Sequence, residues 1–257
     1  MSSKKFKFSF KGQQLSCLWD LDSSWSLEKD GPIDKHVPSL LNARLEDISQ
    51  KWCFIRLAYE KLIPLKKTID DKFDTENWEL TVGNEYWELV LFLNYVFLET
   101  RSLLDLLQKV HILLYLKPNK LPDSFNKFLK AQKYLNQVTN EKYRQRLDSI
   151  KQSTWIKFLL HDSGRPSIRD LQVHSAQIKL SITPNCEQSL DYNICISRGV
   201  NFPHQSQTDS VPMLETIRTI LNGISELLEN FQSAVTEEVK NPGWVNKCNT
   251  ADRKRSG

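Results

Sequence analysis

The feature that most constrains this chain is a repeat of apolar residues with the period of an α-helix in three long segments. Between residues 213 and 235 apolar side chains recur at spacings of three and four, which places them on one helical face. The same spacing runs from Leu41 to Leu62, and residues 84–116 are apolar over a broader face that ends before Pro118. Such faces must be buried against one another, so the sequence predicts a mostly α fold with 84–116 as its central helix.

Shorter elements are predicted around these three. Alternation of apolar and polar residues predicts a β-hairpin near 177–198. Together with this hairpin the helices form one domain over residues 40–240. The helices are expected near residues 40–63, 84–116, 124–137, 141–160, 166–176 and 211–240.

Two segments flank this domain. The N-terminal arm, 1–39, is expected to be irregular, although Phe6, Phe8 and Phe10 alternate with lysine and serine in the manner of a short strand. Residues 241–257 are expected to form a flexible basic tail.

The composition excludes several functions. The chain has 257 residues and a net charge of +4, an ordinary balance for a globular protein. Eight glycines and ten prolines are too few for a turn-rich all-β fold. Neither a G-x-G-x-x-G nor a G-x-x-x-x-G-K-[ST] loop is present, which excludes nucleotide binding by these two devices. The sequence also has no H-x-x-x-H pair, and we expect neither a metal nor another cofactor.

Cysteine usage and hydropathy predict a cytoplasmic protein. The five cysteines are far apart and form no C-x-x-C pair, so neither a disulfide framework nor a zinc site is expected. The longest apolar stretch, Leu89–Leu98, has only ten residues and contains Asn94, whereas a membrane span needs about 20. No apolar segment typical of a signal peptide follows the N-terminal lysines. We therefore expect a soluble protein with no membrane partner.

The most informative stretch for function contains Arg169, Asp170 and His174 at the start of the helix expected from Pro166. Five residues on a helix offset Arg169 and His174 by about 140° and by about 7.5 Å along the axis. The two side chains can meet one phosphate if the histidine bends back, or if two copies face each other across a dimer axis. Histidine can transfer a proton near neutral pH, and arginine can bind a phosphoryl oxygen with two N–H groups.

This pattern resembles the signature of the HEPN superfamily, R-x(4–6)-H, in which Asn, Asp or His is favoured directly after the arginine. Asp170 occupies that position. The stretch Phe97–Leu107, with Arg101-Ser102-Leu103-Leu104-Asp105-Leu106-Leu107, resembles the long second helix of the same superfamily. The resemblance covers about residues 40–240. The hairpin after His174 and the first forty residues depart from the minimal bundle of the superfamily.

The resemblance implies an α-helical bundle that is usually dimeric. Active members of the superfamily are metal-independent endoribonucleases in toxin–antitoxin, phage-defence and RNA-processing systems, and many other members bind or scaffold without turnover. His174 would then be the acid and base, Arg169 the phosphate clamp, and Asp170 a positioning residue. No nucleotidyltransferase motif is present in this chain, so an antitoxin or regulatory partner would be a separate protein.

Two acids on the expected central helix have an open assignment. Asp105 or Glu99 could face the site and orient Arg169 or His174, which would make them supporting residues. Alternatively Asp105 forms an intrahelical ion pair with Arg101, four residues before it, or one of the acids forms a purely structural pair with Arg169 while His174 is a buried histidine.

The charge distribution favours RNA as a partner. Between Lys117 and Lys157 ten basic residues stand against three acidic ones, a local net charge of +7. The candidate RNA-binding residues in this stretch are Lys130, Lys133 and Arg144. Aromatic residues are interleaved with them, namely Phe125, Phe128, Tyr134 and Tyr143.

Two functions follow from these patterns. The first is a HEPN-type, metal-independent endoribonuclease that acts as a homodimer and leaves a 2′,3′-cyclic phosphate. The alternative is a non-catalytic helical HEPN-like module for dimerisation or interaction, whose basic stretch is an ordinary solvated surface.

Overall fold

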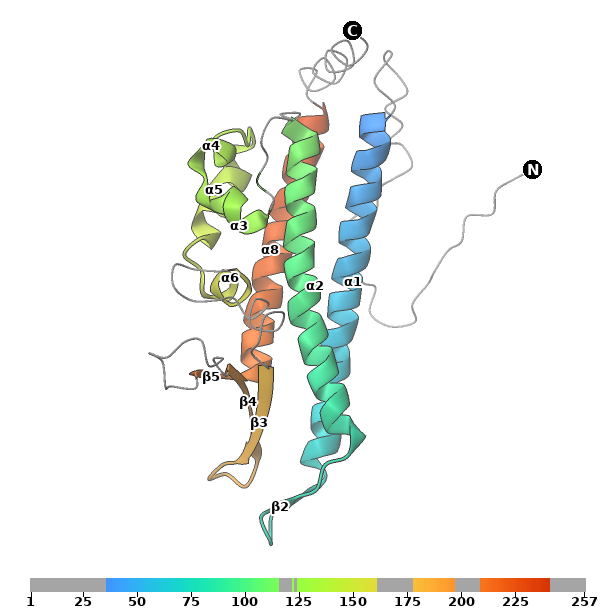
Figure 1. The fold of residues 1–257 in the computed structure, drawn as a ribbon, viewed down its shortest axis with the longest axis vertical. Coiled ribbons are helices and arrows are strands. Elements are labelled where there is room, and N and C mark those ends of the chain that lie inside the picture. Colours follow the sequence, from blue (N-terminus) through green and yellow to red (C-terminus); the bar gives the residue numbers. More distant parts are fainter. Residues whose placement is uncertain (1–35, 116–121, 123, 161–177, 197–208, 241–257) are drawn as a thin grey trace, which may run out of the picture.

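The computed structural model describes residues 36–115, 122, 124–160, 178–196 and 209–240. Over these residues the protein is mostly α, as the sequence predicts. Three long helices run side by side along the length of the molecule (Figure 1). They are α1 (His36–Asp70), α2 (Asn84–Tyr115) and α8 (Met213–Lys240). The helix expected at 166–176 and the tail 241–257 lie outside the described residues, as do residues 1–35 of the arm.

Helix α1 extends further at both ends than its apolar repeat predicts. It begins at His36, inside the expected arm, and it continues past Pro64 to Asp70, whereas we expected an end near residue 63. Proline removes one backbone hydrogen bond and disfavours a helix interior. The helix persists because Leu62 and Ile69, on either side of the proline, are both completely buried. An i,i+4 ion pair of 2.6 Å, Lys66–Asp70, adds to its last turns.

A short connection returns the chain from α1 to α2. It contains two antiparallel strands of two residues each, β1 (Phe73–Asp74) and β2 (Glu79–Leu80), which the sequence pattern did not predict. The Asp74 carboxylate accepts backbone hydrogen bonds from Glu76 and Asn77 at 2.9 and 3.1 Å, which closes the turn between them.

The expected helices 124–137 and 141–160 are each split in two. The elements are α3 (Phe125–Lys130), α4 (Gln132–Leu135), α5 (Glu141–Ile150) and α6 (Thr154–Leu159). The first break is at Ala131, whose backbone is extended. The second is at Ser153, which is also extended and precedes α6. Ser124 and Asn140 cap α3 and α5 by accepting a backbone N–H bond, at 3.4 and 2.7 Å.

The predicted hairpin is present and has a third strand. The strands β3 (Ile178–Pro184) and β4 (Leu190–Ile196) pair antiparallel, and β5 (Asp209–Pro212) pairs with β4 and leads directly into α8. Two tyrosines tie this sheet to the helices: Tyr86 of α2 donates a hydrogen bond to the Leu180 carbonyl oxygen at 3.0 Å, and Tyr192 of β4 donates one to the Asp70 carboxylate at 2.8 Å.

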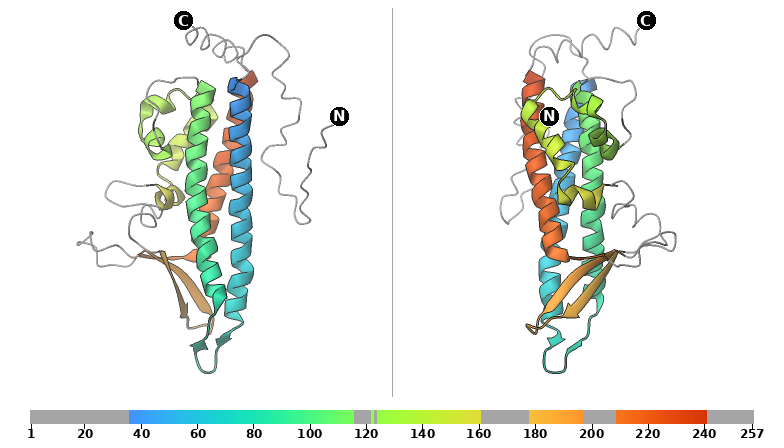
Figure 2. Two further views of the ribbon diagram at one scale, coloured as in Figure 1. Left: turned by 45° about the vertical axis from the view of Figure 1, so that its right-hand side comes forward. Right: turned by 90° about the vertical axis from the view of Figure 1, so that its left-hand side faces the viewer.

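Helix α8 has the cleanest amphipathic pattern and lies beside α2 and the α3–α6 segment (Figure 2). Its apolar face is buried along its whole length, from Met213 to Val239. At Gly223 the backbone lies directly against the indole ring of Trp155 in α6, where a Cβ atom would overlap the ring. The missing side chain is therefore what allows α6 to pack on α8. No helix in the described part of the chain has an apolar stretch long enough to cross a membrane.

We expect Gly223→Ala to destabilise the protein by about 1–3 kcal/mol, the usual cost of overpacking, because the methyl group displaces Trp155. In an unobstructed helix interior the same change stabilises by about 0.5–1 kcal/mol. The free energy of unfolding in urea measures the effect. Gly83→Ala is the matched control, because its Cβ atom would meet only the end of the Glu85 side chain, at 3.1 Å, and we expect a change of about 0.5 kcal/mol or less. A stabilising Gly223→Ala would contradict this packing.

Candidate functional site

The strongest concentration of positive charge in the described chain lies on residues 124–160, which we call the basic module. It comprises helices α3 to α6 and packs on α2 and α8 (Figure 2). Against two acidic residues, Glu141 and Asp148, it carries eight basic ones, a net charge of +6. The basic residues are Lys127, Lys130, Lys133, Lys142, Arg144, Arg146, Lys151 and Lys157.

Part of this charge is neutralised by acids. Arg146 forms an ion pair with Glu226 of α8, and Lys151 forms one with Asp148 at 2.7 Å. Arg144 lies 4.0 Å from Glu141, at the limit of an ion pair. The module nevertheless keeps a large excess of cations, because only these two of its own residues are acidic.

The three predicted RNA-binding residues differ in their surroundings. Lys130 and Lys133 are exposed, and the ammonium group of Lys133 lies 4.9 Å from the centre of the Tyr134 ring. Arg144 is half-buried, and its guanidinium also donates to the Val138 carbonyl oxygen at 3.5 Å. Lys130 and Lys133 are therefore more accessible to a phosphate backbone than Arg144 is.

The aromatic residues interleaved with these cations lie mostly in the core of the protein. Phe125, Phe128 and Tyr143 are buried, at 0, 5 and 1 % exposure, and belong to the core. Of the four aromatic residues interleaved with the cations, Tyr134 alone is partly accessible. The interleaving of aromatic and basic residues therefore reflects two faces of the helices, with rings inward and cations outward. A binding mode on this module depends on phosphate contacts rather than on stacked bases.

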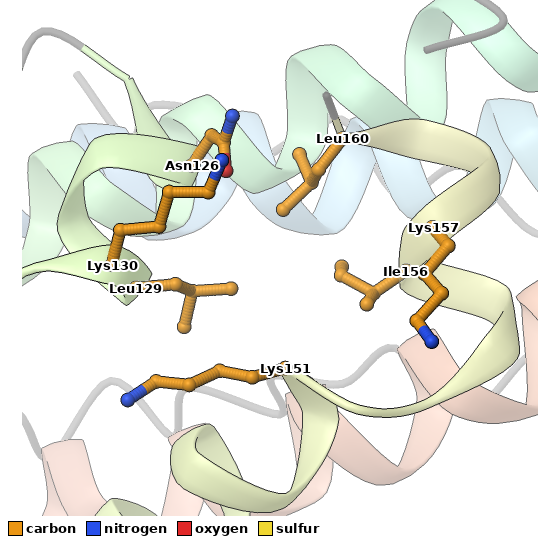
Figure 3. Close-up of a pocket in the computed structure, with 7 residues that line it drawn as sticks. All are labelled: Asn126, Leu129, Lys130, Lys151, Ile156, Lys157 and Leu160. Carbon is orange, nitrogen blue, oxygen red and sulfur yellow. The ribbon is translucent and has the colours of Figure 1, made fainter. Parts of the chain in front are cut away.

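A small cavity of about 60 Å³ opens between α3 and α6. Leu129, Ile156 and Leu160 point into it, and three lysines lie around its rim (Figure 3). These lysines are Lys130, Lys151 and Lys157. Their ammonium groups point in different directions rather than toward one centre. The cavity has room for only a few water molecules, so it does not enclose a larger ligand.

A row of polar residues on α2, of which all but the half-buried Asp105 are buried, fastens the module, and we call it the polar seam. It consists of Arg101, Asp105, Gln108 and His111, at spacings of three and four. Gln108 donates to the Pro122 carbonyl oxygen, and the Asp105 carboxylate accepts the Phe125 backbone N–H at 3.0 Å. The Arg101 guanidinium lies 3.2 Å from the same carboxylate.

The sequence patterns singled out neither Gln108 nor His111, and His111 has the more extensive contacts of the two. Its Nε2 atom lies 2.8 Å from the Tyr143 hydroxyl, and its ring stacks on Phe128 and Tyr143 with centres 4.6 and 5.4 Å apart. Complete burial lowers the pKa of His111 to about 3, against a smaller opposing effect of a backbone hydrogen bond to Leu107. The imidazole is therefore neutral at physiological pH and acts as a structural link between α2 and α5.

The two acids proposed as supporting residues have separate surroundings. Asp105 forms the intrahelical ion pair with Arg101 that one alternative predicts, and it also caps α3. Glu99 pairs with Lys51 of α1. Six residues correspond to about 120° around the helix, so the two carboxylates lie on different sides of α2. Arg169, Asp170 and His174 themselves lie outside the described residues, and whether either acid supports them stays a prediction.

The sequence matches no protein-family model, and searches of curated proteins and of solved structures found no match either. In the described part of the chain no three His, Cys, Asp or Glu side chains gather closely enough to hold a metal ion.

We expect the stability of the protein to decrease as the pH falls below about 6.5. In the unfolded chain His111 binds a proton near that pH, whereas the pKa of about 3 keeps it neutral in the folded protein. This one group therefore contributes a slope of up to about 1.4 kcal/mol per pH unit between these two pKa values and almost none above about pH 8.

Urea unfolding of the His111→Gln variant from pH 4 to 8 tests this slope. Because the variant lacks the imidazole that takes up one proton on unfolding, its free energy of unfolding should depend less on pH, by up to about 1.4 kcal/mol per pH unit. Tyr143→Phe is the control: it removes the hydroxyl at 2.8 Å but keeps the imidazole buried, so it should lower stability and leave the slope unchanged. Equal slopes in the wild type and in His111→Gln would show that His111 is not buried as a neutral ring.

Proposed function

We propose that the protein is a HEPN-type, metal-independent endoribonuclease that binds RNA on the basic module and cleaves it with Arg169 and His174. The observation that carries the proposal is the basic module itself, with its net charge of +6 on an outward surface. Hydrogen bonds fix the module to α2, and the contact of Trp155 with Gly223 fixes it to α8. Arg169 follows Leu160, the last residue of this module, by only nine positions. The charged surface and the R-x₄-H motif are thus consecutive in the chain.

The chemistry of the motif is that of transesterification. A neutral His174 takes the proton of a ribose 2′-hydroxyl, and the 2′-oxygen attacks the adjacent phosphorus. The bond to the 5′-oxygen breaks, and this leaving oxygen takes up a proton from an imidazolium, either the same ring or that of the second copy. The products are a 2′,3′-cyclic phosphate and a free 5′-hydroxyl. Arg169 stabilises the charge that develops on the phosphoryl oxygens, and Asp170 positions Arg169 or the second copy's histidine.

The proposal includes the biological setting that the resemblance implies. The enzyme would act in the cytoplasm as a homodimer whose interface involves the helix expected from Pro166, because two motifs across a two-fold axis supply more groups to one phosphate. A toxin or defence role, with a separate antitoxin or regulatory protein, fits a ribonuclease of this class.

A second candidate function is a non-catalytic interaction module. The specific observation that favours it is an exposed apolar row on α2, the α2 stripe, made of Trp87, Leu91, Tyr95 and Leu98. Exposed apolar rows of this size are typical of protein-binding surfaces. Cleavage of RNA by the pure protein distinguishes the endoribonuclease from the interaction module.

We expect the pure protein to cleave RNA in the presence of EDTA, because both the proton-transfer group and the phosphate clamp are side chains. His174→Ala should lower the rate by about two to four orders of magnitude. Arg169→Lys should restore little of what Arg169→Ala loses, because an ammonium group cannot bind phosphate with a planar fork. Analysis of labelled RNA for 2′,3′-cyclic phosphate ends measures the reaction.

The control for this experiment is His204→Ala, which removes a histidine outside the motif and should leave the rate unchanged. The interaction-module function replaces the enzyme if the wild type shows no chelator-resistant cleavage, or if His174→Ala cleaves as fast as the wild type.

We expect the combined change of Lys130, Lys133 and Arg144 to glutamine to weaken RNA binding without changing the rate at saturating RNA. Three lost phosphate contacts should reduce the slope of log affinity against log salt by about two. Binding of a labelled single-stranded RNA between 50 and 300 mM salt measures this slope. The matched control neutralises Arg56, Lys61 and Lys67 of α1, an equal charge outside the basic module. An equal loss in both triple variants would show a merely non-specific effect of net charge.

A further inference from the structure

The α2 stripe is an apolar surface that no described residue covers. Trp87 and Leu91 are 69 and 63 % exposed, and Tyr95 and Leu98 follow on the same face at 37 and 39 %. The spacings of four, four and three residues place the side chains about 5–6 Å apart along the helix axis. Phe54 of α1 is 51 % exposed and lies one turn from Lys51, whose ammonium group pairs with Glu99 next to this stripe. Phe54 therefore widens the apolar surface on the neighbouring helix.

One end of the α2 stripe lies in the most acidic part of the described chain. Residues 70–88, which include the β1–β2 turn and the first turns of α2, contain seven acids and one lysine, a net charge of −6. Only Lys72, through its ion pair with Glu85, supplies a positive charge within this range. Glu88 is exposed beside Trp87. The surface therefore suits an occupant that is both apolar and basic.

The N-terminal arm has this chemistry. Residues 1–11 contain four lysines and no acid, a charge of +4 from side chains. Within them Phe6, Phe8 and Phe10 occur at every second position, so an extended backbone places the three rings on one side, about 6.6 Å apart. This period is close to the 6 Å that separates Trp87, Leu91 and Tyr95 along α2.

We propose that Phe6, Phe8 and Phe10 of the same chain dock on the α2 stripe, with the neighbouring lysines beside the acidic range 70–88. The connection is long enough. The Lys51–Glu99 ion pair places the Leu98 end of the stripe beside Lys51, which is about 22 Å along α1 from its first residue, His36. From there the stripe extends about 18 Å further, to Trp87. The 25 residues between Phe10 and His36 span up to about 80 Å when extended, and about 25–30 Å as a flexible coil.

A second copy of the chain fits the same surface less well. An antiparallel pairing of two α2 stripes about their centre brings the exposed Glu88 of one chain near Glu99 of the other, whose charge Lys51 already neutralises, so the pairing gains no electrostatic attraction. The arm brings lysines instead. This inference is independent of the proposed RNA cleavage, because it uses neither the motif nor the basic module.

Photo-crosslinking of the full-length protein tests the docking. A benzoylphenylalanine in place of Phe8 should crosslink to residues 87–98 of the same chain, as mapped by mass spectrometry on an equal mixture of light and heavy isotope-labelled protein. Trp87→Ser with Leu91→Ser should abolish that crosslink, and both residues are exposed enough for the protein to stay folded. A crosslink between light and heavy chains would overturn the proposal in favour of a second copy. Crosslinks elsewhere, or none, would overturn it altogether.

Hydroxyl-radical footprinting provides a second readout without a crosslinker. Trp87 and Leu91 should be modified several-fold faster in the Phe6→Ser, Phe8→Ser, Phe10→Ser variant than in the wild type, and high salt should also increase the wild-type rate because it screens the lysines. Tyr134 of the basic module is the internal reference: it is half-buried and lies outside both the α2 stripe and the acidic range 70–88, and its rate should be the same in both proteins. Equal rates at Trp87 in the two proteins would contradict the docking.

Discussion

Helix α2 is held on two sides, and the polar seam on one of them determines where the basic module lies. Burying a guanidinium, an amide and an imidazole in an apolar helix is unfavourable unless each finds a polar partner. Here Gln108 and Asp105 bond to the backbone of residues 122–125, and His111 bonds to Tyr143. A shift of the module by one helical turn would leave these groups without their partners, so the seam fixes the register between α2 and α3–α5.

This register decides which residues of the module face outward. With Phe125, Phe128 and Tyr143 directed into the core around His111, the lysines of the same short helices are left at the surface. Gly223 contributes on the other side, because it lets Trp155 and thus α6 approach α8 closely. The outward charge is therefore a consequence of how the module is packed, and it is the observation on which the RNA binding that we propose rests.

The long helices could be predicted from the sequence because their apolar repeats extend over six turns or more, which leaves no other way to bury the face. The breaks at Ala131 and Ser153 could not, since neither position carries glycine or proline and the apolar pattern continues across both. Pro64 led to the opposite error, the prediction of a helix end where the helix continues. The burial of Leu62 and Ile69 outweighs the preference of proline for a helix end.

Only part of the candidate site could be predicted from the sequence, because the rest depends on contacts between residues that are distant in the chain. Charge excess is a property of composition, so the basic module was visible in the sequence. The side of a helix on which an aromatic ring lies depends on tertiary packing, so the sequence did not show that Phe125, Phe128 and Tyr143 belong to the core. Two polar side chains in the apolar run of α2, Gln108 and His111, were the available signal for the seam, but their partners lie 14 and 32 residues further along the chain.

The measurement that tests the central claim most directly is a map of RNA contacts on the full-length protein. RNA containing 4-thiouridine, crosslinked by light and analysed by mass spectrometry, should attach to peptides of the basic module, residues 124–160, and to the peptide that carries Arg169 and His174. The account predicts that these two sets of crosslinks disappear together at high salt, because both depend on phosphate contacts. Crosslinks confined to α1 and the α2 stripe, with none on the basic module, would contradict it.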